Sequence, residues 1–316
     1  MIEAHGLTKR YGEKLAVDDL TFSVRPGVVT GFLGPNGAGK STTIRMIMGL
    51  DAPTAGSVIV NGRRYAELAA PLREVGALLE ARAVHTGRTA YNHLLALAAT
   101  TGIPRRRVDE VVDLVGLGEV ARKRAGGFSL GMGQRLGIAS ALLGDPATLI
   151  LDEPVNGLDP EGILWIRNLL RALAAEGRTV FVSSHLMSEM ALTADQLIIV
   201  GRGRLIADVS VTELTRAGRP GVHVRSPQAA LLQKVLAGPQ VEVTTTGTDV
   251  LEVDGLDSEA VGRIAAENAV VLYELVPRRA SLEEAFMELT RDDVEFRGNE
   301  AGPLAAAVAS TVGSTS

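Results

Sequence analysis

One glycine-rich run, GPNGAGKST at residues 34–42, limits what this chain can fold into more than any other feature. It fits the pattern G-x-x-x-x-G-K-[ST], which needs a strand before it and a helix after it. Residues 28–33 form a short apolar run rich in β-formers, and residues 41–50 carry apolar side chains at helical spacing. The sequence therefore predicts a strand, a loop and a helix in direct succession.

A loop of this kind is built to bind phosphate. Its glycines let backbone N–H groups turn inward around phosphate oxygens, and the helix N-terminus adds partial positive charge. Lys40 reaches the same oxygens, and the Ser41 hydroxyl is placed to ligate Mg²⁺. We therefore expect a nucleoside triphosphate with Mg²⁺. The residues expected to contact it are Gly34, Asn36, Gly37, Gly39, Lys40, Ser41 and Thr42.

A pair of adjacent carboxylates follows a second apolar run. Residues 148–151 lead directly into Asp152 and Glu153, the form of a strand that ends in a Walker B pair. Alone, an apolar strand that ends in Asp-Glu is a common turn, but beside a phosphate loop it predicts hydrolysis. Asp152 would hold Mg²⁺ through water, opposite Ser41, and Glu153 would polarise the water that attacks the γ-phosphorus.

Length and composition indicate two domains in a soluble protein that stays inside the cell. A chain of 316 residues, 46% hydrophobic, can bury one large core and a second smaller one. Its apolar runs fall short of the roughly 20 residues of a membrane span, and its start does not have the form of a signal peptide. The absence of cysteine excludes disulfides, zinc-thiolate sites and thiol nucleophiles.

Charge is unevenly distributed along the chain. The net charge is −5, whereas residues 240–297 hold 14 Asp or Glu against 5 Arg and no Lys, which leaves that segment at −9. An acidic segment with few aromatic side chains lacks the basic patch and the stacking rings of a nucleic-acid surface. Nucleic acid is therefore not an expected partner.

The first 217 residues alternate between patterns typical of strands and of helices. Short strands surround the phosphate loop at residues 2–7, 20–24, 28–33 and 57–60. Helical periodicity at residues 89–100, 105–115 and 130–143 indicates a helical subdomain over about residues 86–145. Buried-type strands then alternate with helices, which is the rhythm of a parallel sheet. These strands are residues 148–151, 179–183 and 196–200, and the helices are residues 161–176 and 186–193.

A Gly/Pro break at residues 218–221 precedes a second unit, residues 222–297. Its predicted order, β-α-β-β-α-β followed by a last helix, is typical of a small α+β ferredoxin-like domain. Residues 298–316 are rich in Ala, Gly, Ser and Thr, which predicts a disordered tail. The predicted strands are residues 222–225, 241–245, 250–253 and 270–276, and the helices are residues 227–236, 258–268 and 282–290.

The last predicted helix carries one apolar stripe, formed by Leu282, Phe286 and Leu289. A stripe of this kind either closes the core of its own domain or docks on a neighbour, and the sequence leaves both open. Because every phosphate-contacting motif precedes residue 186, we expect the second unit to fold separately and to be dispensable for the chemistry.

A third motif, FSLGMGQR at residues 128–135, opens a predicted helix. Ser129 by itself indicates only an N-cap. Together with the two earlier motifs, however, the run resembles the signature motif of ATP-binding cassette (ABC) ATPases. Tyr11 stands where that family stacks an aromatic ring on adenine, NGLD at residues 156–159 looks like its D-loop, and His185 looks like its switch histidine. The resemblance covers about residues 1–215, with the motifs in the family's order.

The resemblance implies a P-loop NTPase cassette over residues 1–217, an α/β fold with a helical subdomain and an antiparallel β subdomain. It also implies a head-to-tail homodimer that holds two ATP molecules. Each ATP would lie between the Lys40 loop of one chain and the helix start at Ser129 and Gly131 of the other. The other implied nucleotide contacts are Tyr11 and Asp159, and the implied catalytic pair is Glu153 with His185, which would bond the γ-phosphate.

Two positions depart from the family's pattern. Glu80 follows residues 75–79 where the family usually has a Gln that touches Mg²⁺, and Met132 stands where the signature usually has Gln. Glu80 would ligate Mg²⁺ more strongly but adds negative charge beside the phosphates. Both departures resemble bacterial small-molecule and antibiotic exporters whose ATPase is a separate chain with a C-terminal extension.

The sequence thus predicts a cytoplasmic ATPase subunit, held at the inner face of the membrane by a separate permease that exports a drug or other small molecule. The alternative is a soluble cassette protein that acts on ribosomes or DNA. Such proteins typically fuse two cassettes or insert long coiled coils, whereas this chain has one phosphate loop. An ordinary GTPase would carry an Asn-Lys-x-Asp run, and a binding-only sensor would have no use for Asp152 and Glu153.

Overall fold

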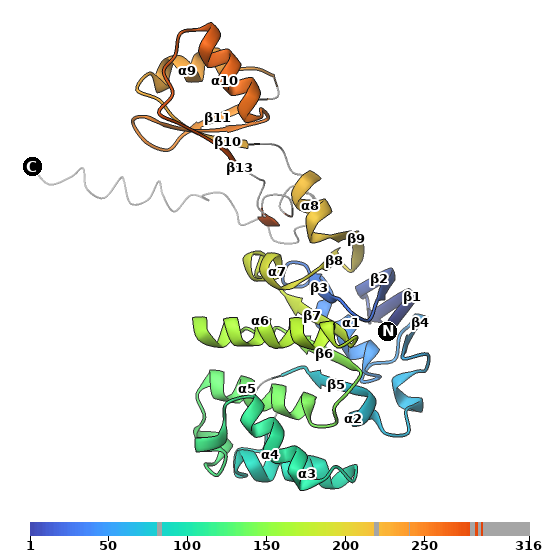
Figure 1. Ribbon diagram of the computed structural model, residues 1–316. Coiled ribbons are helices and arrows are strands. Elements are labelled where there is room, and N and C mark those ends of the chain that lie inside the picture. The colour runs from blue at the N-terminus through green and yellow to red at the C-terminus, as the bar shows by residue number, and fades with distance from the viewer. Residues whose placement is uncertain (81–83, 218–220, 240, 279–281, 284–285, 287–316) are drawn as a thin grey trace, which may run out of the picture.

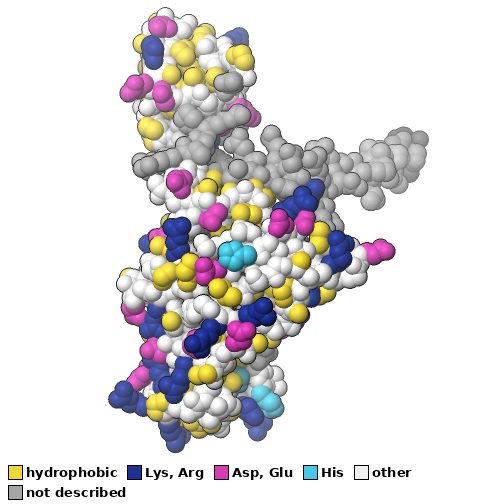
Figure 2. Space-filling model, turned by 90° about the vertical axis from the view of Figure 1, so that its right-hand side faces the viewer, with side chains coloured by type: hydrophobic (Ala, Val, Ile, Leu, Met, Phe, Trp, Pro, Cys, Tyr) yellow, Lys and Arg dark blue, Asp and Glu magenta, His cyan; other side chains and the backbone are white. Residues whose placement is uncertain are grey.

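The computed structural model describes residues 1–80, 84–217, 221–239, 241–278, 282–283 and 286. The strands of these residues form three sheets, of three, six and four strands (Figure 1). The first two sheets belong to the part that carries the three motifs, and the third lies beyond the Gly/Pro break. Figure 2 shows acidic and basic side chains interspersed over one face of the molecule.

The three-stranded sheet is the expected antiparallel one. Its order is β2 (Lys14–Val24), β1 (Ile2–Tyr11) and β4 (Ala55–Val60). Residues 2–7 and 20–24 were the expected strands, but the ladder runs on to a tight turn after Tyr11, where Gly12 takes φ +57°. Glycine adopts that left-handed conformation without the steric cost of a side chain. The hairpin brings Tyr11 to the sheet's end.

The six-stranded sheet places the motifs at a common edge. Five strands run parallel in the order β5, β6, β7, β3 and β8, and β9 adds an antiparallel edge. The carboxyl ends of parallel strands meet at one edge, so the loops after β3, β6 and β7 lie together. The strands are β3 (Val29–Leu33), β5 (Val75–Leu78), β6 (Thr148–Asp152), β7 (Thr179–Ser184), β8 (Gln196–Gly201) and β9 (Arg204–Ser210).

Alternate residues of these strands build two separate cores. Phe32, Ile150 and Phe181 enter the cluster shared with the three-stranded sheet, whereas their neighbours Leu151 and Val182 enter the cluster on the other face. The two phenylalanine rings lie 5.1 Å apart between centroids. Because successive strand residues point to opposite faces, a continuous apolar run is what a sheet covered on both sides requires.

Helices cover the sheet as the periodicity predicted, with ends that coincide with the predicted ones or differ by at most three residues. The helix after the phosphate loop is α1 (Lys40–Ile47). In the second half of the cassette, α6 (Pro160–Ala175) follows β6, and α7 (Met187–Thr193) follows β7. The helical subdomain consists of α3 (Ala90–Thr100), α4 (Arg105–Leu114) and α5 (Leu130–Leu142), which lie together at one end of the molecule in Figure 1. The short α2 (Pro71–Glu74) precedes β5.

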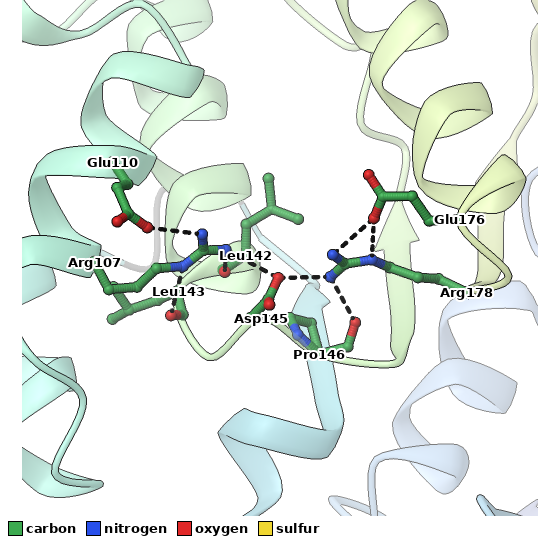
Figure 3. A network of polar contacts seen from close by, with 8 residues as sticks. All are labelled: Arg107, Glu110, Leu142, Leu143, Asp145, Pro146, Glu176 and Arg178. Carbon is green, nitrogen blue, oxygen red and sulfur yellow. Dashed lines mark hydrogen bonds and ion pairs between the residues drawn. The ribbon is translucent and has the colours of Figure 1, made fainter.

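A polar network fixes the helical subdomain to the sheet (Figure 3). Arg107 of α4 donates to the Leu142 and Leu143 carbonyls at the end of α5, at 3.0 and 3.4 Å, and to the Asp145 carboxylate at 3.2 Å. Arg178, just before β7, donates to the same carboxylate at 2.8 Å. Asp145 therefore bridges two arginines, and Arg107 satisfies carbonyls that a helix end leaves unpaired.

Beyond the break, the fold follows the predicted element order. The strands form an antiparallel sheet in the order β11, β12, β10 and β13, with a core of its own under α9 and α10. The last strand was predicted over residues 270–276 but begins at Glu274, because Val270 still donates its N–H to Ala265 at the end of α10. The helix α8 (Val211–Ala217) ends just before the break, and the elements after it are β10 (Gly221–Arg225), α9 (Ala229–Leu236), β11 (Glu242–Thr245), β12 (Val250–Asp254), α10 (Ser258–Glu267) and β13 (Glu274–Arg278).

The described part of the last helix does not close the core of its own unit. Leu282 and Phe286 are 3% and 6% exposed, and both belong to the apolar cluster of the six-stranded sheet, together with Leu214 of α8. Leu289 and the predicted tail at residues 298–316 lie outside the described residues. The chain thus leaves the first unit through α8 and returns to it at Leu282. Among the described helices, none is long and apolar enough to cross a membrane.

Candidate nucleotide site

The phosphate loop joins β3 to α1, and the fold itself demands glycine at two of its positions. A Cβ at Gly34 would lie 2.4 Å from the Val200 carbonyl oxygen of β8. Gly39 takes φ +96°, and a Cβ there would lie 2.6 Å from the Ala16 carbonyl oxygen. Both distances are shorter than any van der Waals contact, so a side chain at either position would displace the loop from the sheet.

Lys40 lies across this loop. Its Nζ donates to the Gly34 carbonyl at 2.6 Å and to the Pro35 carbonyl at 3.3 Å, and the residue is only 7% exposed. Burial lowers the pKa of Lys40, while the nearby charges of Glu153 and Asp152 act in the opposite direction. The ammonium therefore lies within electrostatic range of the Walker B carboxylates. Of the other loop residues, Asn36, Gly37 and Ser41 are exposed and Thr42 is half-buried.

A residue that the sequence did not single out holds the Asp152 carboxylate and the Glu153 backbone at the end of β6. Ser183, paired with Asp152 across β6 and β7, donates its hydroxyl to the Asp152 carboxylate. The same Oγ accepts the Glu153 backbone N–H at 3.0 Å. Strand ends that meet at one edge of a parallel sheet could have suggested this contact, because residues 179–183 were predicted as a neighbouring strand.

Glu153 and His185 are in direct contact. His185 Nδ1 lies 2.8 Å from Glu153 Oε2, and the two side chains are 42% and 21% exposed. His185 directly follows β7, where Ser184 Oγ accepts the Leu186 backbone N–H at 2.9 Å and shapes the turn. The structure therefore brings the predicted catalytic pair together within one chain.

Tyr11 is an exposed ring whose hydroxyl is fixed. Its side chain is 46% exposed, and the hydroxyl donates to the Asp51 carboxylate at 2.8 Å. Arg45 of α1 also binds Asp51, at 2.7 Å, and Lys9 lies 4.9 Å from the centre of the ring. Hydrogen bonds from Arg45 and Tyr11 lower the pKa of Asp51 to about 2. Asp51 was missed, because no motif marks it and its partners are distant in sequence.

Two predicted nucleotide contacts act as helix caps in this chain. Ser129 Oγ accepts the Met132 N–H at 3.2 Å and begins α5, and Asp159 Oδ1 accepts the Gly162 N–H at 2.9 Å and begins α6. Both residues are exposed. Gly131 adjoins the predicted D-loop, since a Cβ there would lie 3.0 Å from the Gly157 carbonyl oxygen. The two helix starts are thus neighbours.

The third predicted metal ligand follows β5, whose last residue, Leu78, pairs with Leu151 of β6. Glu80 is exposed and comes two residues after the end of β5, next to residues 81–83, which are outside the described part. Within the described part, no group of three or more His, Asp or Glu forms a metal cluster. The Ser41 hydroxyl at the start of α1 and the Asp152 carboxylate at the end of β6 are nevertheless hard oxygen donors of the kind that suits Mg²⁺.

Comparison with known proteins identifies the family. Residues 17–156 match the family described as ABC transporter, and residues 220–283 match a domain of unknown function. The ATP-binding subunit of an ABC transporter has a solved structure with a TM-score of 0.63 and 30% identity, and the match covers 68% of this chain and 92% of that one. A dimeric ATP-binding cassette in a post-hydrolysis state with ADP and Pi shares the fold, with a TM-score of 0.61 at 23% identity.

Curated relatives extend the match over nearly the whole chain. The bacitracin transport ATP-binding protein BcrA of Bacillus licheniformis is 36% identical over 92% of this chain and 97% of its own length. The uncharacterized ABC transporter ATP-binding protein YhcH of Bacillus subtilis is 37% identical over 93% of this chain and 97% of its own length. Given this identity and the motifs gathered at one sheet edge, the chain belongs to the ATP-binding proteins of ABC transporters and is an ATPase.

Proposed function

We propose that this chain hydrolyses ATP as a head-to-tail homodimer and drives a separate integral membrane permease that exports an antibiotic or another small molecule. The observation that carries the proposal is the contact between Glu153 and His185 beside the Lys40 loop. Relatives named for transport of bacitracin and lantibiotics and for export of Nod factor support the export of small molecules. The chain would then lie at the inner face of the membrane, held by its permease.

Glu153 is the proposed general base and His185 its partner. An ionised carboxylate only accepts hydrogen bonds, so Nδ1 carries the proton in the 2.8 Å contact. Nε2 then donates to a γ-phosphate oxygen when the ring is protonated, and the ring holds the carboxylate in place in either state. Glu153 would orient and polarise the attacking water, as such residues do in phosphoryl transfer.

Lys40 and the loop amides would bind the β- and γ-phosphates. The carbonyl oxygens of Gly34 and Pro35 hold the ammonium in the loop, and phosphate oxygens would take over its hydrogen bonds. Ser41 and Asp152 would hold Mg²⁺, with Glu80 as a further ligand, and the bound ion would neutralise phosphate charge. Tyr11 would stack on adenine.

The helix start at Ser129 is suited to complete the site of a second chain. Ser129 is exposed at the N-terminus of α5, a helix of 13 residues, where backbone N–H groups and partial positive charge attract anions. Closing this end on the γ-phosphate of the partner chain would add donors that the Lys40 loop lacks and exclude water. Hydrolysis would therefore depend on association.

The chain is proposed to comprise a cassette over residues 1–217, on which Leu282 and Phe286 pack, and an accessory domain that begins at residue 222 and contains the four-stranded sheet. The β-α-β-β-α-β order and the sheet order β11, β12, β10, β13 support a ferredoxin-like topology for the accessory domain. Its role is proposed to be coupling or assembly with the permease, since every predicted nucleotide contact lies in the cassette.

Export can be tested by expressing the chain with a candidate membrane permease in an antibiotic-sensitive host. We expect the permease to co-purify with the chain and tolerance to bacitracin or a lantibiotic to rise, and we expect Glu153→Gln to abolish the tolerance without loss of co-purification. An assembled, ATP-hydrolysing complex that protects against none of a panel of peptide and small-molecule antibiotics would argue against export. Co-sedimentation with ribosomes in place of a membrane protein would favour the soluble alternative.

A further inference from the structure

A buried glutamine connects the helix that begins at Ser129 to the proposed general base. Gln134 lies in the second turn of α5 and is only 2% exposed. Its Nε2 donates to the backbone carbonyl of Glu153 at 3.2 Å. A polar side chain buried to this extent needs a partner, and here the partner is the backbone of the residue that would activate water.

The backbone of Glu153 needs such support. Its φ is +50°, in the left-handed region that residues other than Gly, Asn and Asp avoid. A conformation of this kind persists only where its surroundings enforce it. Ser183 Oγ holds the Glu153 N–H at 3.0 Å, Gln134 holds its carbonyl at 3.2 Å, and His185 holds its carboxylate at 2.8 Å. Three side chains from α5, β7 and the loop after β7 thus fix one residue.

The turn of α5 that carries Gln134 also contacts neighbouring elements. The guanidinium of the adjacent Arg135 stacks on the Trp165 ring of α6 at 4.5 Å and donates to the Val115 carbonyl at 2.9 Å. One turn earlier, Gly131 lies against Gly157 of the predicted D-loop. A shift at the start of α5 would therefore reach the carbonyl of Glu153 through the same short helix segment.

We propose that Gln134 is a positioning residue that makes the left-handed backbone conformation of Glu153 depend on the position of α5. The inference rests on the proposed roles of Glu153 and Ser129. Because Ser129 would contact the ATP held by the partner chain, occupancy of that second site would set the geometry of Glu153 in this chain. Gln134 thus links two ATP sites and contacts neither nucleotide.

The test compares Gln134→Met with the wild-type full-length chain. Methionine keeps the length of the side chain and removes the donor. We expect kcat to fall by about 100-fold, as misplacement of a reacting group does, while KM and the affinity for ATP change by less than about twofold. Gln134→Glu, which replaces the donor by a carboxylate that only accepts, is the second variant and should lose at least as much turnover. Ser140→Ala is the matched control, since among the described residues the Ser140 hydroxyl on the same helix bonds only the Leu136 carbonyl of that helix.

A second measurement separates positioning from general damage. In the Glu153→Gln background, Gln134→Met should cause no further loss of single-turnover rate, because both changes act on one group. A further loss in that background, or an equal loss in Ser140→Ala, would overturn the inference. Wild-type kcat in Gln134→Met and Gln134→Glu, beside an inactive Glu153→Gln, would also overturn it and leave the proposed function intact. Full turnover in Glu153→Gln would instead remove the proposed role of Glu153, and the inference with it.

Discussion

His185 Nδ1 lies 2.8 Å from Glu153 Oε2, and the register of two strands produces this contact. Asp152 pairs with Ser183 where β6 and β7 run side by side, so the residues that follow each strand leave the sheet at the same level. Because side chains alternate between the faces of a sheet, a slip of one residue would turn this pair away from the phosphate loop. The geometry of the catalytic pair is therefore a property of the sheet.

Replacing Glu153 by glutamine should separate binding from hydrolysis. Glu153→Gln keeps the shape of the side chain and removes the base, so we expect kcat to fall by about 100- to 10,000-fold while ATP binding persists. If ATP holds two chains together and hydrolysis releases them, the variant should accumulate as a dimer with ATP and Mg²⁺. Size-exclusion chromatography with light scattering measures this, with ADP as the control. A variant that stays monomeric with saturating ATP would contradict the dimer.

A composite site should be restored by mixing two inactive chains. Lys40→Ala removes the buried ammonium from the loop, and Ser129→Arg blocks the exposed helix start, so each homodimer should lose nearly all ATPase activity. In a mixed dimer, one site combines an intact Lys40 loop with an intact Ser129. We expect activity to return at intermediate ratios and to peak near equal amounts, measured by phosphate release. Inactivity at every ratio would mean either that the site lies within one chain or that both sites must act together.

Features carried by neighbouring residues could be predicted from the sequence. The phosphate loop, the carboxylate pair at Asp152 and the alternation of strands and helices follow from local pattern, and the structure has them. The contacts of Ser183 and Gln134 with Glu153 could not be predicted, because they join positions 30 and 19 residues apart and depend on register and helix placement. Lys40 at the start of α1 is buried, because its ammonium turns back onto the carbonyls of its own loop, which no local pattern predicts.

The ion pair between Arg45 and Asp51, to which the Tyr11 hydroxyl also bonds, should give a pH-dependent contribution to stability. The pKa of Asp51 is lowered from 3.8 to about 2 by its hydrogen bonds to Arg45 and Tyr11. Since the folded-state pKa lies below the unfolded value, the stabilisation is complete above about pH 4 and is lost as pH falls toward 2. We therefore expect Asp51→Asn to lower the urea midpoint at pH 6, with a difference from wild type that shrinks between pH 4 and pH 2. Tyr11→Phe should lower the urea midpoint less, with the same dependence on pH. If the difference from wild type in Asp51→Asn does not change with pH, the pKa of Asp51 is not lowered in the folded protein.

Leu282 and Phe286 should stabilise the cassette although they follow the accessory sheet in the sequence. Both side chains are nearly fully buried in the cluster that includes Leu214, so a cut at residue 218 would expose apolar surface of the cassette itself. We expect Leu282→Ala and Phe286→Ala each to lower the free energy of unfolding by about 2–5 kcal/mol. The chain has a single tryptophan, Trp165 of α6, so its fluorescence in a denaturant titration reports on the cassette alone.

The matched control for these two variants is Leu231→Ala, because Leu231 on α9 is 43% exposed. A truncation of exposed surface of this kind should change stability by no more than about 0.5 kcal/mol. If the unfolding midpoint reported by Trp165 is the same in Leu282→Ala and Phe286→Ala as in Leu231→Ala, then Leu282 and Phe286 do not stabilise the cassette. A chain cut at residue 218 should in that case keep its stability and its ATPase activity. If Leu282→Ala and Phe286→Ala lower this midpoint as expected, the cut at residue 218 should destabilise the ATPase. Loss of transport in the truncated chain would then not by itself show that residues 222–297 contact the permease.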